Sequence, residues 1–123
     1  MSLAQTANAW APRVLSILRI AAGLLLLQHG TTKLLGFPVS QMNGVPLTSI
    51  YGIAGIFELV GGILIVIGLF TRPTAFILSG MTAVAYFHSH APQGFFPLLN
   101  GGELAALYSF VFLYLACAGG GVW

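Results

Sequence analysis

Four long apolar segments constrain this chain more than any other feature. They run from about Val14 to Leu35, from Ile50 to Phe70, from Pro73 to His90 and from Leu104 to Val122. Each is close to the ~20 residues that a helix rising ~1.5 Å per residue needs to cross ~30 Å of hydrocarbon. The segments are continuously apolar rather than alternating, which favours helices over the strands of a membrane barrel. The sequence therefore predicts four transmembrane helices.

The composition agrees with a lipid surrounding. Of the 123 residues, 58% are hydrophobic and only 5% are charged, and the mean hydropathy is +0.96. A soluble domain of this size exposes much of its surface and covers it with charged side chains, which are too few here. We therefore expect the lipid bilayer as a partner. The basic residues are scattered without a basic run, so we expect no binding to nucleic acid. "QHGTTK" follows the first segment where a signal peptide would have its cleavage site, so we interpret that segment as a retained span.

The connections predict one domain over residues 1–123. Only "TRP" separates the second and third segments, which makes their helices antiparallel neighbours. The loops "GFPVSQMNGVPLTS" and "APQGFFPLLNGG" carry no acidic or basic residue. Arg13 and Arg72 fall on one side of the membrane, opposite Lys33, and cytoplasmic loops are enriched in basic residues. We therefore expect an all-α, multi-pass membrane protein, a four-transmembrane-helix antiparallel bundle with both termini cytoplasmic.

Glu58 is the polar residue that most needs an explanation. It lies about 12 Å below the outer surface of the predicted membrane, and His29 lies about 8 Å below it. The helical neighbours of Glu58 are small (Ala54, Gly55, Gly61 and Gly62), so another helix can approach closely. One interpretation is a neutral glutamic acid that joins helices by a hydrogen bond. The other is a functional polar pocket that Glu58 forms with His29 and Lys33, and we favour pairing of His29 with Glu58.

The remaining polar residues have simpler expected roles. Lys33 and Arg19 are expected to extend towards opposite membrane surfaces, with a structural ion pair as the alternative for Arg19. His88 and His90 close the third segment near the outer surface. Asn100 and Glu103 have the spacing of a helix N-cap and its third residue. Tyr108 and the other aromatic residues of the fourth segment are expected to serve packing and lipid contact.

Several chemistries are disfavoured by the sequence. It contains one cysteine, so a dithiol pair within the chain is excluded, and it contains no aspartate for a Ser-His-Asp triad. No glycine-rich loop with lysine and Ser/Thr is present to bind a nucleotide. His29, Glu58, His88 and His90 could form a metal or haem site, but their spacing is not diagnostic. We therefore expect no metal site and rank haem below a quinone.

Three stretches of the sequence form a recognisable set: "RIAAGLLLLQHGTTKLLGF", "ELVGGILIVIGLFTRP" and "GFFPLLNGGELAALYSFVFLYLACAGGG". Together they resemble the DoxX family of small bacterial membrane proteins. The resemblance implies a four-helix protein of the bacterial cytoplasmic membrane, related to oxidoreductases. Its relatives are associated with thiosulfate–quinone or quinol oxidoreductase complexes and with resistance to oxidants. By position, the polar residues of the family correspond to Arg19, His29, Lys33 and Glu58.

These observations predict a membrane component of a redox system, with an outward-facing polar pocket for a quinone-like molecule. Glu58 and His29 would be its catalytic residues and would handle protons, while Lys33, Arg19 and His88 would bind the substrate. The chain shows no electron carrier, so an oxidoreductase partner or a bound cofactor is expected, and a homo-oligomer is a further possibility. The alternative is a non-enzymatic accessory protein or small permeation unit in which Glu58 is structural or a proton site.

Overall fold

The computed structural model describes residues 1–42 and 44–123, and in these ranges the chain is helical without any strand. Asn43, which the sequence places in the first of the two longer loops, lies outside the described residues. The main helices are α1 (Leu3–Leu35), α2 (Ile50–Ile67), α3 (Thr71–Ala85) and α5 (Glu103–Ala118). A π-helical turn η1 (Tyr86–His90), a 3₁₀ turn η2 (Ala91–Gln93) and the short helix α4 (Pro97–Asn100) connect α3 to α5. The all-helical fold class is thus confirmed.

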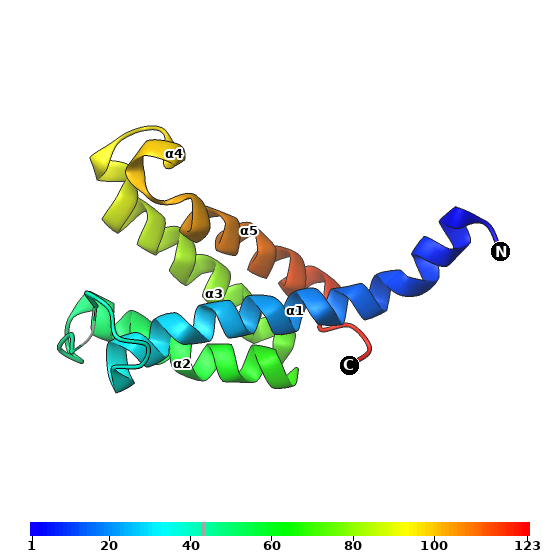
Figure 1. The fold of residues 1–123 in the computed structure, drawn as a ribbon, viewed down its shortest axis with the longest axis horizontal. Coiled ribbons are helices and arrows are strands. Elements are labelled where there is room, and N and C mark those ends of the chain that lie inside the picture. The colour runs from blue at the N-terminus through cyan, green and yellow to red at the C-terminus, as the bar shows by residue number, and fades with distance from the viewer. Residues whose placement is uncertain (43) are drawn as a thin grey trace.

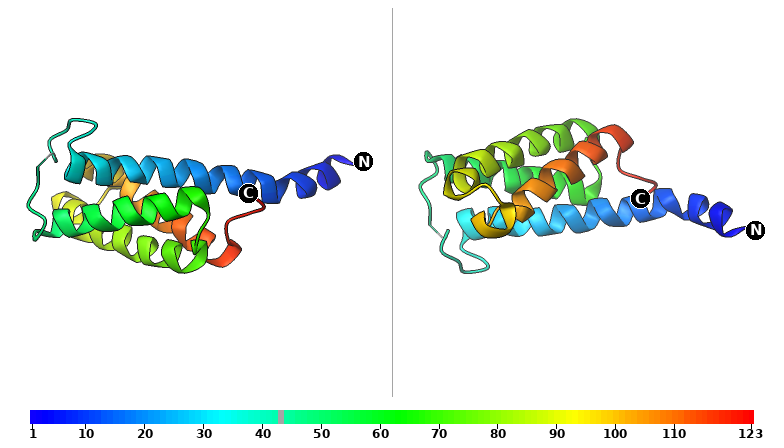
Figure 2. Two further views of the ribbon diagram at one scale, coloured as in Figure 1. Left: turned by 90° about the horizontal axis from the view of Figure 1, so that it is seen from below. Right: turned by 90° about the horizontal axis from the view of Figure 1, so that it is seen from above.

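Helix α1 is longer than the predicted span, which began at Val14. Ser2 and Gln5 form a capping box in which the Ser2 hydroxyl accepts from the Gln5 N–H and the Gln5 side chain accepts from the Ser2 N–H. This cap starts the helix at Leu3, and its first turns are exposed. Figures 1 and 2 show them projecting beyond the other helices. At the other end, Gly36 adopts φ 71°, a left-handed conformation that suits glycine and ends the helix.

The four main helices pack as two antiparallel pairs. Helix α1 lies along α2 and α3 lies along α5, whereas α2 and α3 share a smaller contact and α1 and α5 barely touch. The two pairs meet near the chain termini and diverge towards the loops at the opposite end (Figure 1). All four main helices contribute to one cluster of buried apolar residues: Ala22, Leu26, Ile65, Ala75, Leu78, Tyr108, Phe112 and Leu115. Residues of both helix pairs line a cavity at the loop end, where the pairs diverge.

Glycines allow the α1–α2 pair to pack closely. A Cβ on Gly30 of α1 would lie 2.5 Å from the backbone nitrogen of Leu59 in α2. On the facing side, a Cβ on Gly62 would lie 3.0 Å from the Cα of Leu27. These distances leave no space for a side chain, as in other close helix contacts of membrane proteins. The small-residue face predicted around Glu58 is therefore a helix contact.

Helices α1 and α2 are long and apolar enough to cross a membrane, and α5 is a shorter apolar helix. Helix α3 ends at Ala85 as an α-helix, but η1 continues it to His90, where the sequence placed the end of the third segment. Large apolar side chains lie exposed on the outside of all four helices, including Leu24, Ile63, Phe76 and Phe110. Such extended apolar surface is unusual for a soluble monomer and suits contact with lipid.

Candidate functional site: an interhelical cavity with a buried ion pair

A buried ion pair connects α1 to α2. The Lys33 Nζ lies 2.7 Å from the Glu58 Oε1, and both side chains are about one-tenth exposed or less. The pair forms because Gly55, one turn from Glu58, lets the Lys33 side chain lie against α2: a Cβ there would be 3.2 Å from the Lys33 Cβ. The expectation that Lys33 extends to the membrane surface is therefore wrong. The Glu58 carboxylate instead holds the Lys33 ammonium at the contact between α1 and α2.

The ion pair borders a cavity of about 730 Å³ between the two helix pairs, which we call the interhelical cavity. It lies towards the loop end, where α1 and α2 diverge from α3 and α5. Its polar lining includes His29, Lys33, Glu58, Thr82, His88, His90 and Tyr108. Its apolar lining includes Leu26, Ile53, Phe57, Met81 and Leu104. Ligand-binding cavities of ~300–1,000 Å³ with mostly apolar walls and a few polar groups are common.

His29 and Tyr108 are neighbours in the lining of this cavity. Their rings meet edge to face, with centroids 6.1 Å apart. Among the described residues, the hydrogen-bonding partner of Glu58 is Lys33 rather than His29, so the expected His29–Glu58 pair is not formed. His29 is half-buried and lines the cavity, and its ring nitrogens could donate to or accept from a molecule bound there.

Tyr108 was expected to serve packing, and its place in the buried core cluster confirms that expectation, but the residue also lines the interhelical cavity. Its side chain is buried at 6% exposure, it lines the interhelical cavity, and its hydroxyl has no hydrogen-bond partner among the described residues. A buried tyrosine hydroxyl normally finds a partner. In the sequence, the feature that could have indicated a polar role for Tyr108 is its phenol hydroxyl, which lies in the first turns of an otherwise apolar helix.

The two terminal histidines of the third segment have separate surroundings. His88 lines the cavity rim, where its ring packs edge to face on Tyr51 with centroids 6.1 Å apart. The His90 Nδ1 lies 3.2 Å from the carbonyl oxygen of Asn100, so this ring also contacts the segment that connects η1 to α5. Among residues 1–42 and 44–123, no three His, Cys, Asp or Glu side chains gather closely enough to hold a metal ion.

The Asn100 side chain makes three hydrogen bonds within the connection between α3 and α5, which the sequence did not predict. Asn100 ends α4, and its side-chain oxygen accepts from the Gly102 N–H at 2.8 Å. Its amide nitrogen donates to the Gly94 carbonyl and to the Tyr86 hydroxyl. The N-cap of α5 is Gly102, so Asn100 is not the cap that its spacing from Glu103 suggested. Asn100 instead holds the loop that borders the cavity.

Arg19 does not belong to this cavity. It lies 14 positions before Lys33 on α1, which places it about 21 Å away along the helix axis. Its guanidinium is buried and donates to the backbone carbonyls of Gly120 and Val66. The expectation that Arg19 extends to the surface is wrong, and its partners are carbonyls rather than an acid. The structure thus brings His29, Lys33, Glu58 and His88 together and leaves Arg19 at the other end.

The fold and the cavity define an all-helical, membrane-type protein with a polar cavity between its helix pairs. The chain belongs to the DoxX family, whose family model matches residues 14–91, and this confirms the resemblance seen in the sequence. The matched range includes His29, Lys33, Glu58 and His88 and ends before Tyr108. A Haemophilus influenzae protein described as uncharacterized is 49% identical over 115 residues, which cover 89% of this chain and 86% of that protein. No solved structure matches the chain.

Proposed function

We propose that this protein is a membrane component of a redox system, in which the interhelical cavity binds a quinone-type head group and exchanges protons with it. The observation that carries the proposal is the gathering of four polar groups on one cavity of about 730 Å³. These groups are the His29 imidazole, the Lys33–Glu58 ion pair and the Tyr108 hydroxyl, which has no hydrogen-bond partner in the part of the chain that the structure describes.

The chemistry of a quinone head group fits such a lining. A quinone is a flat ring with two carbonyl acceptors, so it needs apolar walls and a few hydrogen-bond donors. Leu26, Phe57 and Met81 supply apolar walls, and the Tyr108 hydroxyl and Lys33 ammonium are donors. Polar residues placed in an apolar membrane helix are costly, and they commonly mark substrate or proton pathways.

Proton transfer would be the contribution of His29 and Glu58. Reduction of a quinone to a quinol consumes two electrons and two protons, and side chains that accept and release protons can deliver the latter. Lys33 occupies one carboxylate oxygen of Glu58, Oε1, and the hydrogen bond between them fixes the carboxylate beside the cavity. The chain contributes no electron carrier of its own, so electrons would come from a partner oxidoreductase or a bound cofactor.

The proposed topology places this cavity in the outer half of a bacterial inner membrane. Helices α1, α2, α3 with η1, and α5 would each span the bilayer as one domain over residues 1–123, with both termini cytoplasmic. Arg13, Arg19 and Arg72 lie at the end that holds the termini, which agrees with the enrichment of basic residues on the cytoplasmic side. The apolar exterior of all four helices supports spanning.

A second candidate function follows from the ion pair itself. Lys33 and Glu58 satisfy each other at a close, glycine-mediated contact between α1 and α2, as a structural link would. The protein would then be a non-enzymatic accessory protein or a small permeation unit, with Glu58 joining two helices. The two candidates differ in whether Glu58 must accept and release a proton.

The test compares Glu58→Gln and His29→Ala with the control variant Glu103→Gln, whose carboxylate is exposed and does not line the cavity. The measurements are binding of a short-chain ubiquinone to purified protein and tolerance of cells to quinones and oxidants. We expect Glu58→Gln and His29→Ala to weaken quinone binding by about tenfold or more, the loss of one good hydrogen bond to a charged group. We also expect them to abolish tolerance at unchanged protein levels.

Glu103→Gln should behave as the unmodified protein in both assays. Full tolerance with Glu58→Gln would instead favour the structural role, because an amide keeps a hydrogen bond but cannot carry a proton at neutral pH. A lipid-extract mass spectrum and an absorption spectrum of gently purified protein would show directly whether quinone or haem accompanies it.

A further inference from the structure

The end of the molecule that holds the chain termini carries positive charge without a matching acid. Arg13, Arg19 and Arg72 lie there, whereas the two acidic residues of the chain are Glu58, which pairs with Lys33, and Glu103, which begins α5 at the other end. Arg19 is only 3% exposed. A buried cation without an acidic side chain beside it is unfavourable, so an anion bound at this end of the protein would be stabilised.

The protein solvates Arg19 with carbonyl groups but does not neutralise it. The Nη1 donates to the Gly120 carbonyl at 2.6 Å and the Nη2 to the Val66 carbonyl at 3.4 Å. The Nε is buried and has no hydrogen-bond partner among the described residues. Carbonyl oxygens carry only partial charge, so one full positive charge remains at this position.

Next to Arg19 lies a recess of about 510 Å³, which we call the terminal recess. It is lined by Pro12 and Leu15 of α1, by Gly68, Thr71 and Arg72 around the start of α3, and by residues 118–122. The Thr71 hydroxyl is buried, with the residue 8% exposed, and it has no hydrogen-bond partner among the described residues. An unsatisfied hydroxyl and an arginine on one wall are the groups that bind an oxyanion.

The glycine-rich C-terminal segment brings these groups together. A Cβ on Gly120 would lie 3.1 Å from both the Arg19 Nη1 and the Thr71 Oγ1, and a Cβ on Gly119 would lie 3.1 Å from the Arg72 Nε. Figures 1 and 2 show this segment running from the end of α5 back towards α1. The Trp123 N–H donates to the Ser16 hydroxyl and fixes it there. The absence of a Cβ at these two glycines lets the segment lie close to both guanidinium groups.

The start of α3 adds a favourable dipole. The N-cap residue is Phe70, with φ 53°, and no side chain caps the first turn of this 15-residue helix. The uncapped N–H groups give a helix N-terminus partial positive charge, which attracts phosphate and other anions. Thr71 and Arg72 are the first two residues of the helix, so their side chains and the helix terminus act on the same space.

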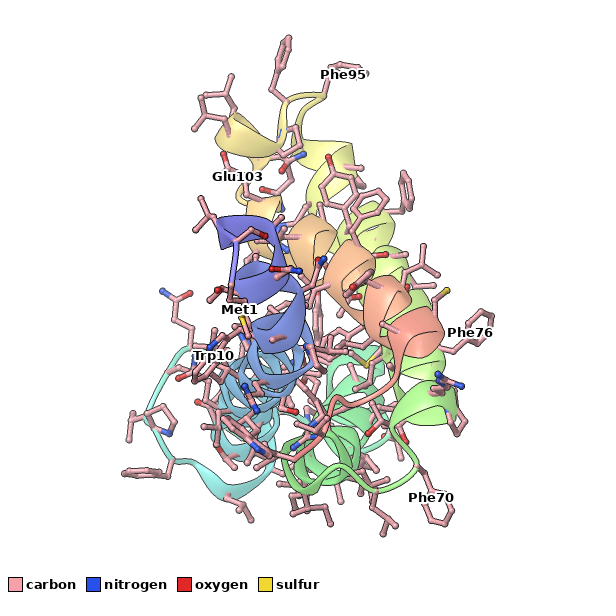
Figure 3. All side chains as sticks on the ribbon, turned by 90° about the vertical axis from the view of Figure 1, so that its right-hand side faces the viewer. Met1, Trp10, Phe70, Phe76, Phe95 and Glu103 are labelled. Carbon is pink, nitrogen blue, oxygen red and sulfur yellow. The ribbon has the colours of Figure 1, made fainter. Side chains whose placement is uncertain are left out.

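We propose that the terminal recess binds a phosphate group, held by the Arg72 guanidinium and the Thr71 hydroxyl, with the charge of Arg19 behind them. The phosphate of an anionic lipid head group is the source that the surroundings favour. Trp10, Phe70 and Trp123 lie exposed at this end, and tryptophans and other aromatic residues commonly mark the membrane interface. Figure 3, which views the molecule from this end, shows Phe70 projecting outward from the bundle.

The test uses delipidated protein in detergent and three probes: phosphatidylglycerol, phosphatidylcholine and inorganic phosphate. Binding is measured by native mass spectrometry and by the shift in thermal unfolding temperature. Arg72→Gln and Thr71→Val change the proposed site. Arg13→Gln is the matched control, because Arg13 carries the same charge at the same end but stacks on Trp10 outside the recess. Arg72 is exposed, so its replacement leaves the core intact.

We expect saturable binding of phosphatidylglycerol, weakened about tenfold or more by Arg72→Gln through loss of a charge-assisted hydrogen bond. Thr71→Val should weaken it less, and Arg13→Gln should leave it unchanged. If inorganic phosphate competes and shows the same dependence on Arg72, the site stands and free phosphate is its ligand. Equal effects of Arg72→Gln and Arg13→Gln, or no saturable binding of any probe, would overturn the proposal.

Discussion

The Lys33 ammonium of α1 and the Glu58 carboxylate of α2 lie 2.7 Å apart at a buried contact between the two helices. Each residue is costly alone in an apolar environment, and each makes the other tolerable. The two residues are 25 positions apart in sequence but lie on facing surfaces of α1 and α2. Their ion pair places one positive and one negative charge beside the interhelical cavity.

The first prediction concerns the stability of this pair. Removing one partner, by Lys33→Met or Glu58→Leu, should destabilise the protein by about 3–5 kcal/mol, the usual cost of leaving a buried charge uncompensated. The double variant Lys33→Met/Glu58→Leu should be more stable than either single variant. Thermal or denaturant unfolding in detergent measures all three. If the two single effects simply add in the double variant, the residues are not coupled.

The second prediction concerns the glycine contact between α1 and α2. Gly30→Ala should destabilise the protein by roughly 1–3 kcal/mol, because its Cβ would lie 2.5 Å from the Leu59 nitrogen and force the helices apart. Gly80→Ala is the matched control, since a Cβ there meets nothing within 4 Å. It should stabilise α3 by roughly 0.5–1 kcal/mol. Effects of the same sign would contradict this account of the helix contact.

The third prediction concerns topology. In a Cys117→Ser background, cysteines placed at the exposed positions Thr48 and Gln93 should react with a membrane-impermeant thiol reagent added to intact cells. A cysteine at Asn8, in the exposed first turns of α1, should react only after the inner membrane is opened. The reverse pattern would place the termini outside and the interhelical cavity on the cytoplasmic side.

Hydropathy predicted the existence of the four main helices because long apolar segments are visible in any single sequence, and two of these helices are long and apolar enough to cross a membrane. Helix ends were less predictable. The helix α1 begins eleven residues before Val14 because Ser2 and Gln5 cap it, a polar signal that a hydropathy argument does not weigh. The end of α1 at Gly36 follows the usual preference for glycine at this position.

Partner choice among polar residues was the part that sequence reasoning could not settle. Depth along each helix correctly placed His29, Lys33 and Glu58 around one cavity, but it could not choose Lys33 over His29 as the partner of Glu58. That choice depends on helix rotation and on the space left by Gly55, which are three-dimensional quantities. Arg19 was misplaced for the same reason, because its carbonyl partners Gly120 and Val66 are distant in sequence.

The last prediction concerns Tyr108. The residue lines the interhelical cavity, its buried hydroxyl has no hydrogen-bond partner among the described residues, and its ring meets that of His29 edge to face. Tyr108→Phe removes only this hydroxyl, so stability should change little or rise slightly, because no hydrogen bond within the protein is lost and a buried unsatisfied group disappears. A bound quinone carbonyl would lose a donor, so ubiquinone binding should weaken by roughly five- to tenfold, the usual contribution of one hydrogen bond.

Tyr114→Phe is the matched control, because that tyrosine is exposed on the same helix and does not line the cavity. It should leave both stability and quinone binding unchanged. The two measurements separate a ligand-binding role from a packing role. Unchanged quinone binding in Tyr108→Phe, together with unchanged stability, would remove this hydroxyl from the proposed site. A large loss of stability would show that the hydroxyl has a structural partner when the protein lies in the membrane.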